Sequence, residues 1–206
     1  MNEMIEPIRD EFIEPQKREG PFLIAGLGNP GRKFEHNRHN VGFMLLNRLS
    51  EKLGERFGKV ESKALVAKAI FKGERVVLVK PQTFMNNSGA PVSSLVRFYK
   101  VPLDNLLVAY DDVDLPLGTL RLRPSGGSAG QKGMQSIIER LGTEEFPRLR
   151  MGTGRPPGRN DAADYVLQDF PSQETELVKE TLDRAVEAVL IFIEFGIDRA
   201  MNTYNG

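Results

Sequence analysis

The chain has 206 residues, balances 28 Lys and Arg against 28 Asp and Glu, and is 40% hydrophobic. These are ordinary values for a globular protein with a buried core, and the length predicts one domain. Cysteine is absent, which excludes disulfides, thiolate metal sites and cysteine nucleophiles and fits a reducing, cytoplasmic location. The sequence holds no apolar run of membrane-spanning length, so we expect no membrane partner.

The charges are unevenly distributed along the chain. Residues 119–159 carry eight bases against three acids, a net of +5, whereas residues 161–206 carry three bases against ten acids, a net of −7. A local basic face can attract phosphate groups while the whole chain stays neutral. On charge alone, a solvated surface whose charges balance in space is the simpler interpretation.

Residues 1–20 are polar, lack a helical or strand period, and are interpreted as a flexible N-terminal extension without a secretory signal. Beyond them, short apolar runs predict strands and four-residue apolar repeats predict helices. The elements predicted for the first half are a strand at 22–27, a helix at 40–53 ending at Gly54, a hairpin of 64–71 and 75–79, and a helix at 88–100 ended by Pro102.

The second half continues this alternation. Strands are predicted at 106–110, 120–123 and 149–152, and a helix at 134–141 follows a glycine-rich loop. The longest predicted helix is 173–195, with Ser172 as its N-cap and Gly196 at its end. Hairpins mixed with strand–helix alternation predict an α/β fold over residues 21–206: a single-domain three-layer sandwich with a central mixed β-sheet flanked by helices.

Groups that can accept a proton near neutral pH are scarce in this sequence. Its two histidines, His36 and His39, both lie in the loop between the first strand and the first helix. If general-base chemistry occurs, one of them is the leading candidate, because histidine titrates nearest to physiological pH. A histidine that simply bonds a backbone group is the structural alternative.

The first strand runs into 26–31 (GLGNPG), which has the form of a dinucleotide-binding fingerprint. That fingerprint needs a helix to begin at its third glycine, and here Pro30 and a polar stretch delay the helix by about two turns. The glycines are better explained as a sharp turn that brings Asn29 to the carboxyl edge of a buried strand, where α/β proteins usually have their sites.

Three further loops, 80–89, 110–116 and 123–133, are expected near the same edge. The glycines of 123–133, together with Lys132, could cradle a phosphate. Each loop also has a structural explanation, as a turn, a carboxylate cluster or a flexible tether. The acids at 111, 112 and 114, with the two histidines, permit a metal site, but a His-x-x-His outside a helix is a poor metal signature.

Together these segments resemble the bacterial-type peptidyl-tRNA hydrolase family. The resemblance is carried by 26–31 (GLGNPG), 38–43 (RHNVGF), 80–86 (KPQTFMN), 110–116 (YDDVDLP), 146–150 (FPRLR) and 154–156 (GRP), in that family's order, and it covers 22–200. It implies a monomeric α/β domain that hydrolyses N-blocked peptidyl-tRNA without a cofactor or metal, with tRNA as its partner.

The resemblance also implies roles for individual residues. By the family's pattern, His39 is the catalytic base and Asp111 is the carboxylate that orients it. Asn29 and Asn86 hold the peptide backbone and help to distinguish a blocked amine from a free one. This chemistry is reasonable because an ester is an easier target than an amide, so water activated by a histidine can suffice without a covalent nucleophile.

The remaining implied residues contact the tRNA end of the substrate. Phe34 falls where the family usually has an aromatic residue beside that end, and Phe84 is expected to line the same cleft. Arg123 and Arg150 match basic positions that engage the acceptor end. Arginines grip phosphates without reading sequence, as an enzyme acting on many tRNAs requires.

One departure from the family concerns Lys132. The family's glycine-rich loop usually ends in His-Asn-Gly, whereas this chain has 131–133 (QKG). Lysine donates hydrogen bonds but cannot accept them, so it cannot copy an amide that does both. Either water or Asn87 replaces the acceptor, or the site is retuned, or catalysis is lost.

Two rival functions remain open. The first is a non-catalytic RNA-binding relative that docks RNA on the basic 119–159 region. The second is a metal-dependent hydrolase built on the histidines and the acids of 111–114. Fold class does not choose among them, because function lies in the site.

Overall fold

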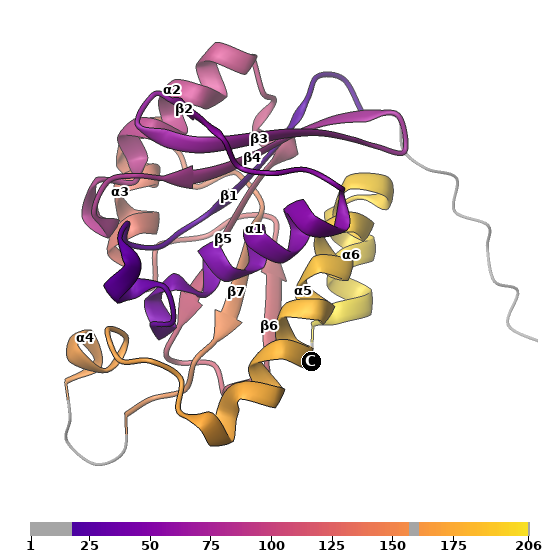
Figure 1. Ribbon diagram of the computed structural model, residues 1–206. Helices are drawn as coiled ribbons and strands as arrows, with labels where there is room; N and C mark the ends of the chain where they lie inside the picture. The colour runs from indigo at the N-terminus through magenta and orange to yellow at the C-terminus, as the bar shows by residue number, and fades with distance from the viewer. Residues whose placement is uncertain (1–17, 157–160, 206) are drawn as a thin grey trace, which may run out of the picture.

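The computed structural model describes residues 18–156 and 161–205, and its centre is a seven-stranded sheet (Figure 1). The strands are β1 (Phe22–Gly26), β2 (Lys59–Glu61), β3 (Ala64–Phe71), β4 (Glu74–Pro81), β5 (Leu106–Asp112), β6 (Leu120–Arg123) and β7 (Arg148–Gly152). Their order is β2-β3-β4-β1-β5-β7-β6. Strands β4, β1, β5 and β7 are mutually parallel, while β2, β3 and β6 pair antiparallel, so the sheet is mixed as predicted.

Helices cover both faces of this sheet and produce the three layers (Figure 1). One face carries α1 (Val41–Lys52), α5 (Thr175–Phe195) and α6 (Ile197–Tyr204), and the other carries α2 (Gly89–Tyr99) and α3 (Lys132–Leu141). Alternate residues of β1 serve the two cores: Ile24 packs with the α1 and α5 side, and Leu23 packs with the α2 and α3 side. Strands buried on both faces account for their continuous apolar runs.

The start of α1 lies unusually close to the end of β1. A Cβ atom added to Gly26 would lie 2.2 Å from the carbonyl oxygen of Gly42, and one added to Gly42 would lie 2.5 Å from the backbone nitrogen of Leu27. Glycine at both positions therefore lets the two backbones touch. This contact fixes the loop between β1 and α1, which holds both histidines, against the sheet edge.

The predicted helices and strands are all present, with some bounds that differ. β5 continues to Asp112, so that carboxylate and its neighbour Asp111 belong to the strand. Helix α2 ends at Tyr99 because Lys100 adopts a left-handed conformation (φ 54°), before Pro102 is reached. Ser172 is not the N-cap of α5. It lies in a separate 3-10 turn, Ser172–Glu174, and Glu174 precedes the helix without a side-chain cap bond.

Three short elements were not predicted: β2, α6 and α4 (Ala162–Tyr165), the last lying apart from the two helix layers (Figure 1). Most of the predicted N-terminal extension, 1–17, lies outside the described residues. Its last residues contact the domain, where the Glu19 carbonyl accepts a hydrogen bond from Asn105 Nδ2 at 2.9 Å. Across 18–156 and 161–205, we find no helix with the length and apolarity needed to cross a membrane.

Candidate active site

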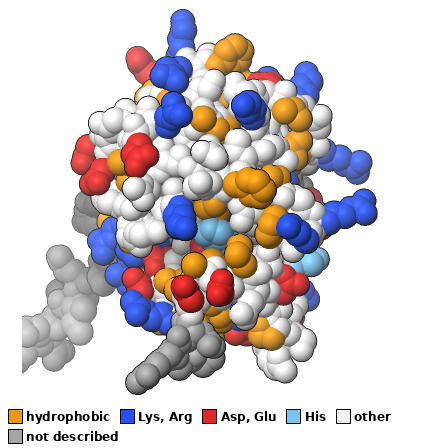
Figure 2. Space-filling view, turned by 90° about the vertical axis from the view of Figure 1, so that its left-hand side faces the viewer, with side chains coloured by type: hydrophobic (Ala, Val, Ile, Leu, Met, Phe, Trp, Pro, Cys, Tyr) orange, Lys and Arg blue, Asp and Glu red, His pale blue; other side chains and the backbone are white. Residues whose placement is uncertain are grey.

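A cavity of about 400 Å³ lies where the parallel strands β1 and β5 end. Its walls come from the loop after β1, the 3-10 turn η2 (Arg38–Asn40), the end of β5, residues 128–132, and α4 with the residues that follow it. Figure 2 shows a hollow on this side of the molecule, with a histidine at its floor and charged side chains of both signs around it. The cavity thus lies at the carboxyl edge of the sheet, where the sequence analysis expected a site.

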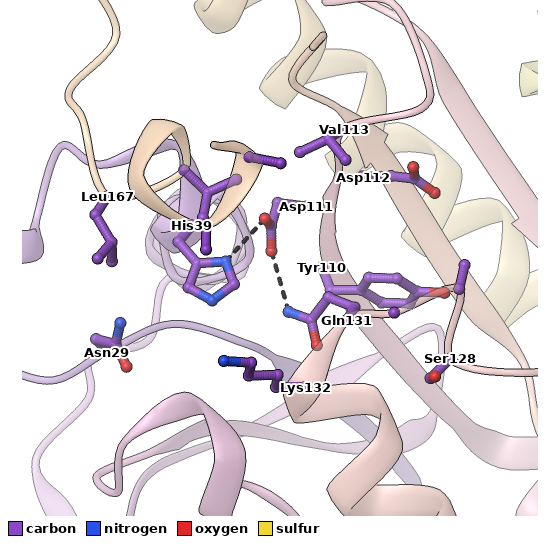
Figure 3. A pocket seen from close by; sticks show the side chains of 15 residues that line it. Asn29, His39, Tyr110, Asp111, Asp112, Val113, Ser128, Gln131, Lys132 and Leu167 are labelled. Atoms are coloured by element: carbon purple, nitrogen blue, oxygen red, sulfur yellow. Dashed lines mark hydrogen bonds and ion pairs between the residues drawn. The ribbon is translucent and has the colours of Figure 1, made fainter. Parts of the chain in front are cut away.

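His39 and Asp111 lie side by side in the wall of this cavity (Figure 3). His39 Nδ1 lies 2.8 Å from Asp111 Oδ2, and the two side chains are 14% and 3% exposed. An ionised carboxylate only accepts hydrogen bonds, so Nδ1 carries the ring proton and Nε2 keeps its lone pair. In this arrangement Nε2 is the ring nitrogen that can take a proton from water.

Hydrogen bonds from both flanks hold the His39 backbone and its loop. The His39 N–H donates to the carbonyl of Val166 at 2.8 Å, which ties the turn η2 to the segment after α4. Next to it, Asn40 clamps the backbone of Asn29: its Oδ1 accepts from the Asn29 N–H at 2.8 Å and its Nδ2 donates to the Asn29 carbonyl at 2.9 Å. The two ends of the loop between β1 and α1 are therefore fixed to each other.

The Asn29 side chain has a defined orientation. Its Oδ1 accepts a hydrogen bond from the backbone N–H of Met85 at 2.9 Å, a contact between the loops after β1 and β4. Because the amide oxygen is used, the Nδ2 group is the part left for the cavity, which Asn29 lines. A neutral donor suits a carbonyl oxygen or a developing oxyanion.

Gln131 is a member of the site that the sequence did not single out for a contact. Its Nε2 donates to Asp111 Oδ1 at 3.1 Å, so both oxygens of that carboxylate have partners (Figure 3). Lys132, the next residue, also lines the cavity and is exposed. Ala162 and Leu167 belong to the wall as well. The sequence analysis did not predict this wall, for which the short stretch that follows Asp161 is the only sequence signal.

A second cavity of about 390 Å³ adjoins the first and shares Tyr110 and Ala129 with it. Arg123 and Arg150, both predicted, line it. Arg123 is exposed, whereas Arg150 Nε bonds Asp112 Oδ2. Burial raises the pKa of Tyr110 to about 12, so its hydroxyl is neutral at working pH.

Arg148, which also lines the second cavity, has a structural role. Its guanidinium donates to the carbonyl of Glu144 at 2.6 Å and to that of Phe146 at 3.1 Å, and also bonds carbonyls of the glycine-rich loop. Burial lowers the pKa of Arg148. This side chain holds the loop 126–127 in place, and its charge is directed inward.

Three predicted site residues are outside the set that lines either cavity: Phe34, Phe84 and Asn86. Phe84 is 63% exposed, and Asn86 is exposed on the 3-10 turn Met85–Asn87. Phe34 is half-buried, with Lys33 Nζ 4.7 Å from its ring centre. They flank the Asn29–Met85 contact in sequence, and their roles stay predictions.

The acids considered for a metal site are engaged elsewhere. Asp112 bonds Arg150, and Asp114 Oδ1 accepts from Arg155 NH2 at 2.6 Å. His36 is exposed. Within the part of the chain that the structure describes, no three or more His, Cys, Asp or Glu side chains come together to hold a metal ion.

Comparisons with known proteins find relatives over most of the chain. The model of a family described as peptidyl-tRNA hydrolase matches residues 23–206. The chain is 50% identical over 185 residues to the peptidyl-tRNA hydrolase of Thermoanaerobacter sp. (strain X514), covering 90% of this chain and 100% of the relative. It is 49% identical over 184 residues to that of Carboxydothermus hydrogenoformans, covering 89% and 98%. A crystal structure of peptidyl-tRNA hydrolase from Acinetobacter baumannii matches with a TM-score of 0.84 and 32% identity, covering 90% and 96%.

Proposed function

Because the chain belongs to the peptidyl-tRNA hydrolase family and is therefore an ester hydrolase of peptidyl-tRNA, we propose that it cleaves N-blocked peptidyl-tRNA with His39 as the general base. The observation that carries this proposal is the bond of 2.8 Å between His39 Nδ1 and Asp111 Oδ2 at the floor of a cavity. That bond leaves Nε2 as the proton acceptor.

The reaction follows from this arrangement. His39 Nε2 takes a proton from a water molecule as the water oxygen attacks the ester carbonyl carbon. Asp111 stabilises the imidazolium that forms, as carboxylates do in hydrolytic triads. When the tetrahedral intermediate collapses, the bond to the tRNA 3′ oxygen breaks and the imidazolium returns its proton to that oxygen. The products are a peptide carboxylate, whose carboxyl proton passes to solvent, and a tRNA with a free terminal hydroxyl.

Two donors of the cavity are placed to act on the substrate carbonyl or oxyanion. Asn29 presents Nδ2, since its oxygen is held by Met85. Lys132 adds a cationic donor where the family usually has an asparagine, and a cation favours a developing negative charge. We assign Asn86 to the peptide backbone of the substrate, and Phe34 and Phe84 to its tRNA end.

The second cavity is proposed to receive a phosphate of the tRNA. Arg123 supplies an exposed guanidinium and Arg150 a second one shared with Asp112. Bidentate arginine contacts give affinity without sequence readout. We also propose that the enzyme works as a monomer in the cytosol, where its substrate arises.

The proposal is tested by release of peptide from N-acetyl-aminoacyl-tRNA. His39→Ala is expected to abolish turnover while folding and tRNA binding are retained, and the matched variant His36→Ala is expected to leave turnover within about twofold of wild type. A chelator should have no effect. Equal losses in both variants, or loss with chelator, would revive the metal-dependent hydrolase. A wild-type protein that binds tRNA without releasing peptide would support the non-catalytic RNA-binding alternative.

A further inference from the structure

The side chain of Gln131, near the end of the glycine-rich loop 123–133, contacts three other residues. It is 9% exposed, and its Oε1 accepts a hydrogen bond from the N–H of Met134 at 2.8 Å, which caps the start of α3. Its Nε2 donates to Asp111 Oδ1 at 3.1 Å and lies 3.2 Å from Met85 Sδ. Because the cap fixes the amide oxygen, the amide nitrogen must face Asp111.

Capping alone does not explain a glutamine at this position. The side chains that best cap helices are short ones, namely Ser, Thr, Asp and Asn, because their oxygens reach the first N–H groups directly. Gln131 is longer, and the additional length brings its Nε2 within bonding distance of the carboxylate. Its amide therefore connects the N-terminus of α3 to the carboxylate that holds His39.

We propose that Gln131 is a positioning residue for catalysis: it holds Asp111 by Oδ1, so that Oδ2 fixes the His39 ring with Nε2 toward the substrate. This inference rests on the proposed role of His39. Without Gln131, Asp111 can rotate about its side-chain bonds and its Oδ1 loses its donor, so the ring is aligned less often. A neutral amide keeps its donor at every pH, which a titrating side chain at the same place would not do.

The chain offers variants that separate positioning from capping. Gln131→Ser keeps a good cap but is too short to reach Asp111. Gln131→Glu keeps a capping oxygen and replaces the donor with a second carboxylate beside Asp111. Gln135→Ser is the matched control, since Gln135 lies one turn further along α3, is exposed, and its side chain donates to Glu139 at 3.0 Å.

The first measurement is turnover of N-acetyl-aminoacyl-tRNA together with thermal stability. Gln131→Ser should lower kcat roughly 10- to 100-fold, the range expected when a hydrogen bond to a charged group is lost. Its KM should stay within about twofold of wild type, and its melting temperature should match that of Gln135→Ser. Wild-type kcat in Gln131→Ser, or a loss of activity that only follows a loss of stability, would overturn the proposal.

The second measurement reads the His39 ring directly. With two histidines in the chain, ring-nitrogen NMR assigned through His36→Ala reports the tautomer and titration of His39. The other charged groups lining the cavity are Lys132 and Asp112, the latter held by Arg150, and all the variants retain them. Gln131→Glu should move the loss of the ring proton to higher pH, because a second negative charge favours the imidazolium.

The two readouts distinguish the possible failures. In one outcome, the wild type releases no peptide, yet its His39 ring carries the proton on Nδ1, and in Gln131→Ser the proton is divided between Nδ1 and Nε2. In that outcome the positioning role of Gln131 stands and the proposed catalytic role of His39 fails. If wild type is active and His39→Ala is not, yet both Gln131 variants keep the wild-type tautomer and kcat, then positioning by Gln131 fails alone.

Discussion

Asp111 is the residue on which the geometry of the site depends. It is 4% exposed, and its two oxygens bond His39 and Gln131. A carboxylate in this position fixes the tautomer of its histidine and stabilises the imidazolium. An amide of the same shape can do neither reliably, because it can present an N–H to the ring.

Asp111→Asn should therefore fold normally and lower kcat by about 10³- to 10⁴-fold, with little change in KM, as the loss of the orienting carboxylate does in hydrolytic triads. Steady-state kinetics on N-acetyl-aminoacyl-tRNA measure both constants. The control is Asp114→Asn, whose side chain bonds Arg155 at the surface. A variant that keeps kcat but raises KM would show that Asp111 binds substrate and does not orient the base.

At this scale the sequence indicated several residues that the structure brings together. Scarcity of histidine and the family's motifs selected His39, Asp111 and Asn29, and the structure places all three around one cavity. The contact of Gln131 was hidden because α3 begins at Lys132, two residues before the predicted Met134. The glycine-rich loop before α3 has no apolar period, so the sequence did not show where the helix starts or that Gln131 caps it.

At the scale of elements, the segment after residue 160 forms a wall of the first cavity and is joined to the turn η2 that carries His39. Arg38 lies where the two segments meet and is 3% exposed. Its guanidinium carbon lies 4.3 Å from the ring centre of Tyr165 and 4.8 Å from that of Phe170. Its NH1 donates to the Glu174 carboxylate at 2.6 Å. Its backbone N–H also donates to Gln168 at 3.0 Å.

The Arg38–Glu174 pair should show a measurable coupling energy. In a double-mutant cycle of Arg38→Met and Glu174→Gln followed by urea unfolding, we expect about 1–2 kcal/mol of coupling, because one partner is buried and the hydrogen bond is charge-assisted. The matched exposed pair Lys179–Glu176, at 3.4 Å, should give less than about 0.5 kcal/mol. Equal couplings for the two pairs would mean that burial adds nothing to the Arg38–Glu174 pair.

Length explains which elements could be predicted. Helix α5, with 21 residues, shows its apolar face over several turns, whereas α4 has four residues and β2 has three, too few to show a period. The 3-10 turn before α5 also has no apolar signature, and it displaced the predicted cap at Ser172. The wall of the site was therefore the part of the fold least visible in the sequence.

For the whole molecule, several basic side chains in 119–156, the described part of the basic 119–159 region, are paired with acids or directed inward. Arg148 points inward to carbonyl groups, while Arg150 and Arg155 bond Asp112 and Asp114. Arg123 is exposed beside the second cavity. The solvated-surface interpretation thus holds for part of this segment, and the proposed phosphate grip is confined to few groups.

Binding of peptidyl-tRNA should consequently weaken with salt, and Arg123→Ala should reduce the slope of log KM against log salt by about one unit or less, as expected for one phosphate contact. A short peptidyl-nucleotide ester should be nearly indifferent to this change. The control is Arg75→Ala. Arg75 is exposed near the start of β4, whereas the first cavity lies where the parallel strands end. A KM that does not depend on salt would place tRNA recognition elsewhere.

The pH dependence of peptide release under single-turnover conditions tests the central claim, that His39 paired with Asp111 activates water. Between about pH 5 and 9, the wild-type rate should rise as the histidine loses its proton and then level off, because only the neutral ring accepts a proton from water. His39→Ala should be slow and lack this rise. A flat wild-type profile, or the same rise in His39→Ala, would contradict general-base catalysis by His39.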